Sequence, residues 1–161
     1  MNVALGGTFD PVHDGHHALF ERAFSLGDVT VGLTADSLAA QTRTVDRPVR
    51  AYETRKTTLE AELEPLAATH DREFEIRTLR EPTGIATEPG FDVLVVSPET
   101  VDGAERINEI RVEQGREPLR IEVVDHVMAE DGERISSTRI LRGEIDRHGN
   151  LTPAATGRSP E

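Results

Sequence analysis

Five short runs of apolar and β-branched residues alternate along this chain with segments whose apolar residues recur at helical spacing. The run 91–96, Phe-Asp-Val-Leu-Val-Val, is typical of a strand buried on both faces of a sheet. In segment 52–67, Leu59, Leu63 and Leu66 share one helical face, and the glutamates between them face outward. Such alternation predicts parallel strands joined by right-handed helical crossovers. We therefore expect an α/β fold with a doubly wound parallel five-stranded sheet and helices on both faces.

The expected elements form one domain followed by a polar tail. We expect strands at residues 2–5, 28–34, 74–79, 91–96 and 119–124. We expect helices at 15–26, 52–67, 104–115 and 135–142, a short helix or turn at 35–40, and loops at 42–49 and 81–90. Because 161 residues with 36% hydrophobic content fill one core, we expect a single domain at 1–146. Residues 147–161 lack periodicity, and we expect them to be disordered or poorly packed.

The charge of the chain excludes one class of partner. The sequence carries 30 Asp and Glu against 18 Lys and Arg, so its formal net charge is −12. Nucleic acids and anionic membranes bind mainly through Lys and Arg that neutralise phosphates. We therefore expect neither a nucleic acid nor a membrane as partner, and the sequence indicates no obligate protein partner.

The acidic surface has two interpretations. It is either an ordinary solvated surface or an adaptation to high salt, where a short Debye length removes self-repulsion. The near absence of lysine, with Lys56 alone among the basic residues, favours the second interpretation. We therefore expect thermal stability to rise from low to multimolar KCl.

The absence of cysteine and of long apolar runs indicates a cellular compartment. Without cysteine there is no disulfide framework, no thiolate nucleophile and no Cys-ligated metal site. No apolar run approaches the length of a membrane span, and residues 1–8 lack the basic region and cleavage site of a signal peptide. We expect a cytoplasmic protein.

A glycine turn followed by two histidines carries the strongest functional signal. Segment 6–16 reads Gly-Gly-Thr-Phe-Asp-Pro-Val-His-Asp-Gly-His. A strand that ends in glycines and leads into a helix presents backbone N–H groups and the positive end of the helix dipole, which together bind phosphate. His13 and His16 flank Gly15, so both imidazoles can face a ligand at the helix start. The absence of a side chain at Gly15 lets that ligand approach the backbone.

Each part of this pattern has a second interpretation. A glycine-rich turn between strand and helix also occurs for packing reasons alone. The histidine pair is also half of a possible zinc site, which would need further ligands from His70, His126, His148 or carboxylates. The run Ser-Ser-Thr at 136–138 is either an ordinary helix N-cap or a set of phosphate-binding hydroxyls.

Two motifs together resemble the signatures of the HxGH nucleotidyltransferase superfamily. The first is Gly7-Thr8-Phe9-Asp10 with His13-x-Gly15-His16, and the second, of the form ISSTxxR, is Ile135-Ser136-Ser137-Thr138. Leu141 stands where that second signature usually has arginine, so Arg139 or Arg142 would supply the charge. The resemblance spans residues 6–142 and implies a Rossmann-like fold.

The resemblance implies adenylyl or cytidylyl transfer. In that reaction a substrate phosphate attacks the α-phosphorus of the nucleotide, and pyrophosphate leaves. A phosphate monoester with a second pKa of about 6 is already ionised at neutral pH, so no general base is needed. His16 would contact the α-phosphate in the transition state, His13 would lie on the triphosphate, and Thr8 would bind the attacking phosphate. Mg²⁺ would accompany ATP, held by phosphates and water rather than by protein side chains.

The resemblance also implies a set of nucleotide-binding residues. These are Gly6, Gly7, Thr8, Phe9, Asp10, His13, Gly15, His16, Ser136, Ser137, Thr138 and Arg139.

The acceptor is indicated by a narrower resemblance. Segments 31–36, 52–55, 95–100 and 103–111 resemble the archaeal and eukaryotic type of phosphopantetheine adenylyltransferase, which joins ATP to 4′-phosphopantetheine and gives dephospho-CoA. A halophilic archaeal origin would fit the composition. The alternatives are transfer to nicotinamide mononucleotide, FMN or glycerol 3-phosphate, and a nucleotide-binding protein without catalysis.

The loop after the second strand departs from this family. Members commonly carry a lysine there, near the attacking phosphate, whereas this chain has Arg43, Arg47 and Arg50. An arginine can replace such a contact through its bidentate fork. We expect Arg43 and Arg47, with Thr8, to bind the acceptor.

Overall fold

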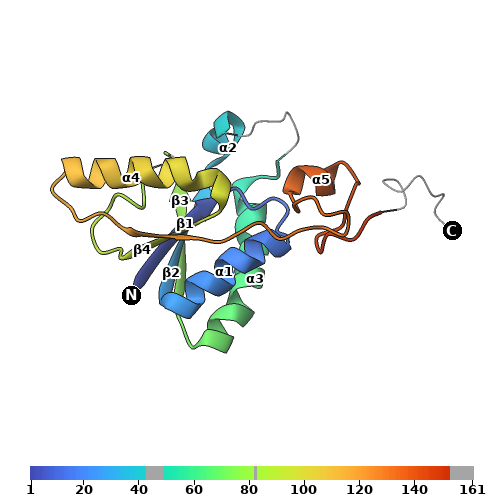
Figure 1. Cartoon of the computed structure of the whole chain (residues 1–161), viewed down its shortest axis with the longest axis horizontal. Helices are drawn as coiled ribbons and strands as arrows, with labels where there is room; N and C mark the ends of the chain where they lie inside the picture. Colours follow the sequence, from blue (N-terminus) through green and yellow to red (C-terminus); the bar gives the residue numbers. More distant parts are fainter. Residues whose placement is uncertain (43–48, 82, 153–161) are drawn as a thin grey trace.

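The computed structural model describes residues 1–42, 49–81 and 83–152, and its centre is a five-stranded parallel sheet (Figure 1). The strands lie in the order β3-β2-β1-β4-β5, and every neighbouring pair is parallel. Their bounds are β1 (Asn2–Gly7), β2 (Asp28–Thr34), β3 (Phe74–Leu79), β4 (Val93–Val96) and β5 (Arg120–Val123). The predicted α/β class and the five strands are confirmed.

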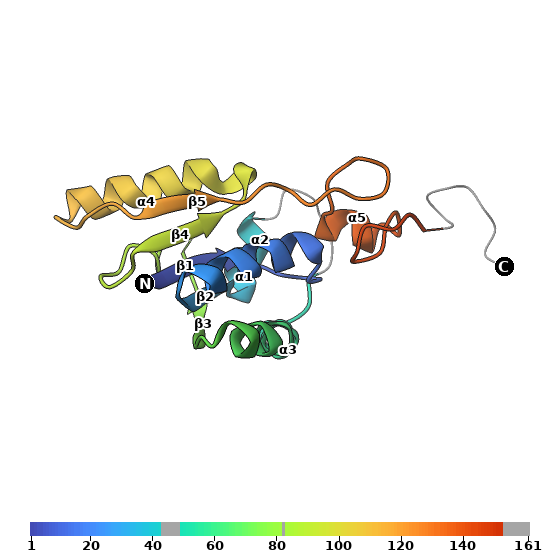
Figure 2. The same ribbon diagram turned by 60° about the horizontal axis from the view of Figure 1, so that its bottom comes forward.

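Helices cover both faces of this sheet, as the sequence predicts. They are α1 (Asp14–Leu26), α2 (Asp36–Thr42), α3 (Tyr52–His70), a 3₁₀ turn η1 (Pro98–Thr100), α4 (Val101–Glu113) and α5 (Ser137–Leu141). Figures 1 and 2 show α4 on one side of the sheet and α1 with α3 on the other. No helix among the described residues combines the length and apolar character needed to cross a bilayer.

Residues that alternate along β1 and β4 pack on opposite faces of the sheet. Val3 and Val93 belong to a core cluster with Phe20 of α1 and with side chains of α3. Ala4 and Leu94, one position further, pack with residues of α4. Because both faces are covered, these strands read as continuous apolar runs rather than as alternating patterns.

Residues 147–152 are packed, which corrects the boundary expected from the sequence. The Asp14 backbone N–H donates to the Arg147 carbonyl at 3.0 Å, and His148 Nδ1 lies 2.9 Å from an Asp14 carboxylate oxygen. The Arg147 guanidinium lies 2.8 Å from the Glu62 carboxylate. These contacts join residues far apart in the sequence through polar groups, so apolar periodicity gives no sign of them. Residues 153–161 lie outside the described part of the chain.

Candidate functional site

The site lies where the strand order reverses. The chain leaves β1 on one side toward α1 and β2, and it leaves β4 on the other side toward α4 and β5. In doubly wound sheets, ligands bind outside the carboxyl ends of the strands at such a reversal. A cleft of about 260 Å³ lies there, between the start of α1 and the segment that leads into α5. Figures 1 and 2 both show α5 beside the N-terminal end of α1.

The cleft brings together residues from both sequence motifs. Its lining includes His13, Gly15, His16, Ser136, Ser137 and Thr138. Ser97 and Glu99, which follow β4, and Asp125 and His126, which follow β5, line it too, as does Arg134. The two motifs are about 120 residues apart in the sequence, and the parallel sheet brings them to one place.

His13 and His16 cap the first turn of α1. The Gly15 backbone N–H donates to His13 Nδ1 at 3.0 Å, and the His13 backbone N–H donates to His16 Nδ1 at 3.3 Å. The two rings are stacked, with centroids 3.8 Å apart and planes at 20°. The sequence analysis assigned the backbone N–H groups at this helix start to phosphate. Two of them, those of His13 and Gly15, instead donate to imidazole nitrogens.

These caps fix the tautomer of both rings. A nitrogen that accepts a backbone N–H carries no proton, so in each neutral ring the proton lies on Nε2. Burial lowers the pKa of His13 to about 4, helped by Arg147 and Arg134 and opposed by Asp14. His13 is therefore neutral at neutral pH. Both side chains line the cleft.

Glycine is required at position 15 for a reason that differs from the expected one. A Cβ atom at this position would lie 2.8 Å from His13 Cε1 and 2.9 Å from His13 Nδ1. Glycine is required here because the His13 ring folds back over the helix start.

Four residues expected at the nucleotide support the site rather than line the cleft. A Cβ at Gly7 would lie 3.0 Å from the Phe9 ring, and Phe9 is buried against His16 with ring centroids 4.9 Å apart. The buried Asp10 carboxylate accepts the Arg50 backbone N–H at 2.7 Å and Arg50 Nε at 2.5 Å. Gly6 lies at the end of β1. None of these four residues lines the cleft, and they belong to the end of β1 and the loop that follows it: Gly6, Gly7, Phe9 and Asp10.

The Ser-Ser-Thr run both caps α5 and faces the cleft. Ser136 Oγ accepts the Arg139 backbone N–H at 3.2 Å, which is an N-cap, and its own hydrogen stays available to a ligand. Ser137 Oγ donates to the Pro11 carbonyl at 2.8 Å. That bond uses the only hydroxyl hydrogen of Ser137, so this residue ties the second motif to the first.

Arg139 is directed away from the cleft, contrary to the expectation. Its guanidinium binds the Asp131 carboxylate at 2.5 Å, the Glu144 carboxylate at 3.4 Å and the Arg134 carbonyl at 3.0 Å. The hydrogen bond from Arg139 lowers the pKa of Asp131. Arg139 therefore braces the α5 segment. Arg142 follows this helix, is exposed and does not line the cleft either.

Arg134 is a cleft residue that the sequence reasoning missed. Among the described residues that line the cleft it is the one arginine, and it pairs with Glu99. Its place directly before the ISST run is the signal that could have identified it. The motif drew attention to the hydroxyl residues and to the missing arginine at 141, not to the residue that precedes the motif.

Thr8 does not line the cleft and lies at the carboxyl ends of β1 and β2. Its Oγ1 is 2.9 Å from Thr34 Oγ1, and either hydroxyl can be the donor. Arg43 and Arg47, the other expected acceptor ligands, lie outside the described residues. Arg50 is described, and its guanidinium pairs with Asp10.

The zinc interpretation finds no ligand group in the described part of the chain. There, no three His, Asp or Glu side chains gather in a geometry that could hold a metal ion. His70 pairs with Glu21, and His148 pairs with Asp14. His126 lines the cleft near the histidine pair.

Comparison with known proteins identifies relatives over almost the whole chain. The profile of a family described as cytidylyltransferase-like matches residues 4–143. A phosphopantetheine adenylyltransferase from Methanosarcina barkeri is 47% identical over 152 residues, covering 92% of this chain and 91% of the relative. Another from Archaeoglobus fulgidus is 43% identical and covers 94% of this chain and 99% of the relative. A solved structure of a protein of unknown function from Archaeoglobus fulgidus has a TM-score of 0.68 at 37% identity, covering 78% of this chain and 90% of that one.

Proposed function

This chain belongs to the cytidylyltransferase-like family, and on that premise we propose that it transfers the adenylyl group of ATP to 4′-phosphopantetheine, giving dephospho-CoA and pyrophosphate. One observation carries the proposal. The stacked His13 and His16 rings offer two Nε2–H donors at a cleft that also contains the Ser-Ser-Thr run and Arg134. Such a set of donors suits a triphosphate.

The nucleotide is proposed to bind with its phosphates in this cleft. His16 Nε2–H stabilises the charge that develops on the α-phosphate as the acceptor oxygen attacks, and His13 binds the triphosphate beside it. Ser136 and Thr138 donate hydroxyl hydrogens to the β- and γ-phosphates, and Arg134 exchanges Glu99 for a phosphate oxygen. A neutral His13 suits this role, because it donates without needing a proton from solvent.

Catalysis in this proposal needs positioning rather than a general base. The acceptor phosphate is ionised at neutral pH, so the chain's own groups hold the two substrates in line and bind the leaving pyrophosphate. Thr8 donates its hydroxyl hydrogen to the attacking phosphate, and Arg43 and Arg47 supply positive charge to it. The hydrogen bond from Ser137 to Pro11 keeps the two halves of the nucleotide site at a fixed separation.

Mg²⁺ is proposed to enter with ATP. This ion takes oxygen ligands and usually combines phosphates and waters with one or two carboxylates. Glu99 and Asp125 line the cleft, so carboxylate oxygens are within the same lining as the phosphate donors and fit such an ion. When bound, Mg²⁺ neutralises charge on the triphosphate.

Pyrophosphate release tests the proposal. The protein is incubated with ATP and Mg²⁺ and, in separate reactions, with 4′-phosphopantetheine, nicotinamide mononucleotide, FMN or glycerol 3-phosphate. We expect pyrophosphate and dephospho-CoA with 4′-phosphopantetheine only, and no release without an acceptor. Preferred turnover with another acceptor would replace the proposed substrate, and ATP binding without turnover would indicate a non-catalytic nucleotide-binding protein.

A further inference from the structure

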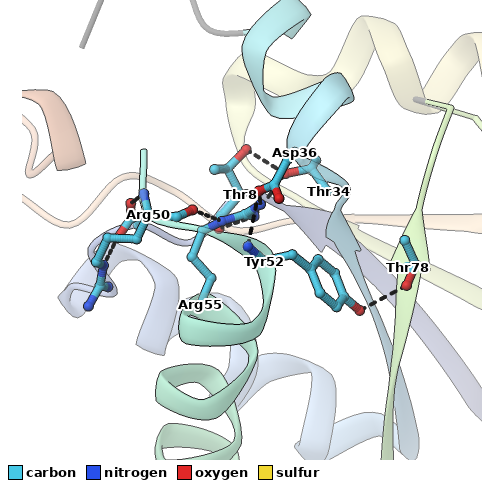
Figure 3. A network of polar contacts seen from close by, with 8 residues as sticks. Thr8, Thr34, Asp36, Arg50, Tyr52, Arg55 and Thr78 are labelled. Carbon is cyan, nitrogen blue, oxygen red and sulfur yellow. Dashed lines mark hydrogen bonds and ion pairs between the residues drawn. The ribbon is translucent and has the colours of Figure 1, made fainter. Parts of the chain in front are cut away.

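Arg55 is a fully buried cation in the first turn of α3, with 0% of its surface exposed. A buried guanidinium is costly unless its N–H groups are bonded, so its partners show what its position is for. Nε donates to the Arg50 carbonyl at 2.8 Å, Nη1 to the Thr8 carbonyl at 3.3 Å and to Thr34 Oγ1 at 3.2 Å, and Nη2 to Asp36 at 3.0 Å. Figure 3 shows these groups converging at the ends of β1 and β2.

The charge of Arg55 is only partly balanced. Among the described residues, its carboxylate partner is Asp36, whose side chain is 64% exposed and therefore screened by water. The other partners are neutral oxygens, and the Tyr52 ring lies 5.9 Å from the guanidinium carbon. The guanidinium therefore places a positive charge next to Thr8, which is where the proposed acceptor phosphate would lie.

The contact between Arg55 and Thr34 favours one direction for the hydrogen bond between the Thr34 and Thr8 hydroxyls. Thr34 Oγ1 accepts an N–H from Arg55 and lies 2.9 Å from Thr8 Oγ1. A hydroxyl that accepts from a cation becomes a stronger donor through its own hydrogen. With Thr34 donating to Thr8, the Thr8 hydrogen is left for a phosphate oxygen. An approaching anion favours this same direction, because it accepts and does not donate.

We infer that Arg55 is a positioning residue that acts through Thr34 to make the Thr8 hydroxyl a donor to the acceptor phosphate. The inference rests on the proposed function, because it assumes that Thr8 meets the acceptor. Arg55 also binds the Thr8 carbonyl, so both the backbone and the hydroxyl of Thr8 are held from the same side.

Arg111 provides a matched control within the same protein. It is also buried, at 4% exposed, and lies in helix α4, which packs on the sheet. Within the described part of the chain, its Nε donates to the Glu117 carbonyl and its Nη1 to the carbonyls of Ala86 and Glu88, at 2.7 to 3.0 Å. Arg55→Lys should therefore lower kcat/KM for 4′-phosphopantetheine as well as stability, whereas Arg111→Lys should lower stability while leaving the kinetic constants for both substrates unchanged.

A double-mutant cycle between Thr34 and Thr8 tests the inference. Thr34→Val should lower kcat/KM for 4′-phosphopantetheine about tenfold and leave the KM for ATP within about twofold, since one charge-assisted donor is lost. Thr34→Ser, which keeps the hydroxyl, should retain near wild-type values. In a Thr8→Val background, Thr34→Val should cost less than about twofold, because the two residues act through one hydroxyl.

The outcomes separate this inference from the proposed function. Equal losses from Thr34→Val in both backgrounds would overturn it, since a purely structural role gives additive effects. Thr34→Ala removes the same hydroxyl with a smaller side chain and gives the same test should the valine variant fail to fold. If the wild-type protein turns over 4′-phosphopantetheine and the Thr8→Val variant does so equally well, the inference is overturned while the proposed reaction stands. No dephospho-CoA from the wild-type protein would overturn the proposed function and with it the inference.

Discussion

The cleft and the Thr8–Thr34 pair lie at the same end of the sheet, but they direct their hydrogen-bond donors in different ways. In the cleft, backbone N–H groups donate to Nδ1 of both imidazoles, so the proton of each neutral ring lies on Nε2. At the pair, a buried guanidinium occupies one side of Thr34 and favours donation from Thr34 to Thr8. The first device depends on histidines being neutral. The second depends on the positive charge of the Arg55 guanidinium.

The largest effect is expected at His16. His16→Ala should lower kcat on the order of 10²-fold or more, with a smaller change in the KM for ATP, since the proposed contact strengthens in the transition state. Steady-state kinetics with both substrates measure this. His70→Gln, a variant on the far end of α3 whose ring pairs with Glu21, is the control and should keep wild-type constants. An unchanged kcat in His16→Ala would contradict the assigned role.

The free energy of unfolding of the protein should depend on pH through His13, which lies in the cleft. Its pKa is about 4 in the folded protein and about 6.5 when unfolded, so between these values the unfolded chain binds more protons. The free energy of unfolding should therefore fall as pH falls from about 6.5 toward 4, with up to about 3 kcal/mol from this residue.

Denaturant titrations at about pH 7 and about pH 4.5 measure that loss. In His13→Asn, which keeps an N-cap oxygen but cannot titrate, the loss should be smaller by about 2 kcal/mol. Equal losses in the wild-type protein and in His13→Asn would show that the burial of His13 carries no such penalty.

The fold was predictable because local patterns and global topology agree. Buried β-branched runs such as 91–96 marked the strands, and the spacing of Leu59, Leu63 and Leu66 marked α3. The short element after β2 was left open between helix and turn, and it is the helix α2. The end of the packed chain was misplaced, because residues 147 and 148 make polar contacts with α1 and α3, and residues 149–152 make them with residues 130, 143, 144 and 146.

The sequence indicated part of the lining of the cleft but not the contacts that its residues make. The two motifs identified His13, His16 and the Ser-Ser-Thr run, which the structure brings to one cleft. Composition and spacing do not reveal which polar side chains bond to each other. Asp10 and Arg139 were therefore assigned to the nucleotide, although Asp10 pairs with Arg50 and Arg139 pairs with Asp131.

Two arginines illustrate what the sequence does not show. Arg55 lies within a segment that matches a family pattern and Arg134 directly precedes one, but the sequence does not show which groups either side chain contacts. The role of each follows from its surroundings, a buried network for Arg55 and a cleft wall for Arg134. These surroundings are assembled from residues far apart in the chain.

The central claim is that the cleft holds the triphosphate while the Thr8–Thr34 pair holds the acceptor phosphate. Calorimetric titration of each substrate alone into wild-type, Arg134→Ala and Thr8→Val proteins tests it most directly. The account predicts a crossed pattern: Arg134→Ala weakens ATP binding about tenfold and leaves 4′-phosphopantetheine binding unchanged, and Thr8→Val does the reverse. If Thr8→Val weakened ATP as much as the acceptor, or Arg134→Ala weakened both equally, the division between the two regions would be contradicted.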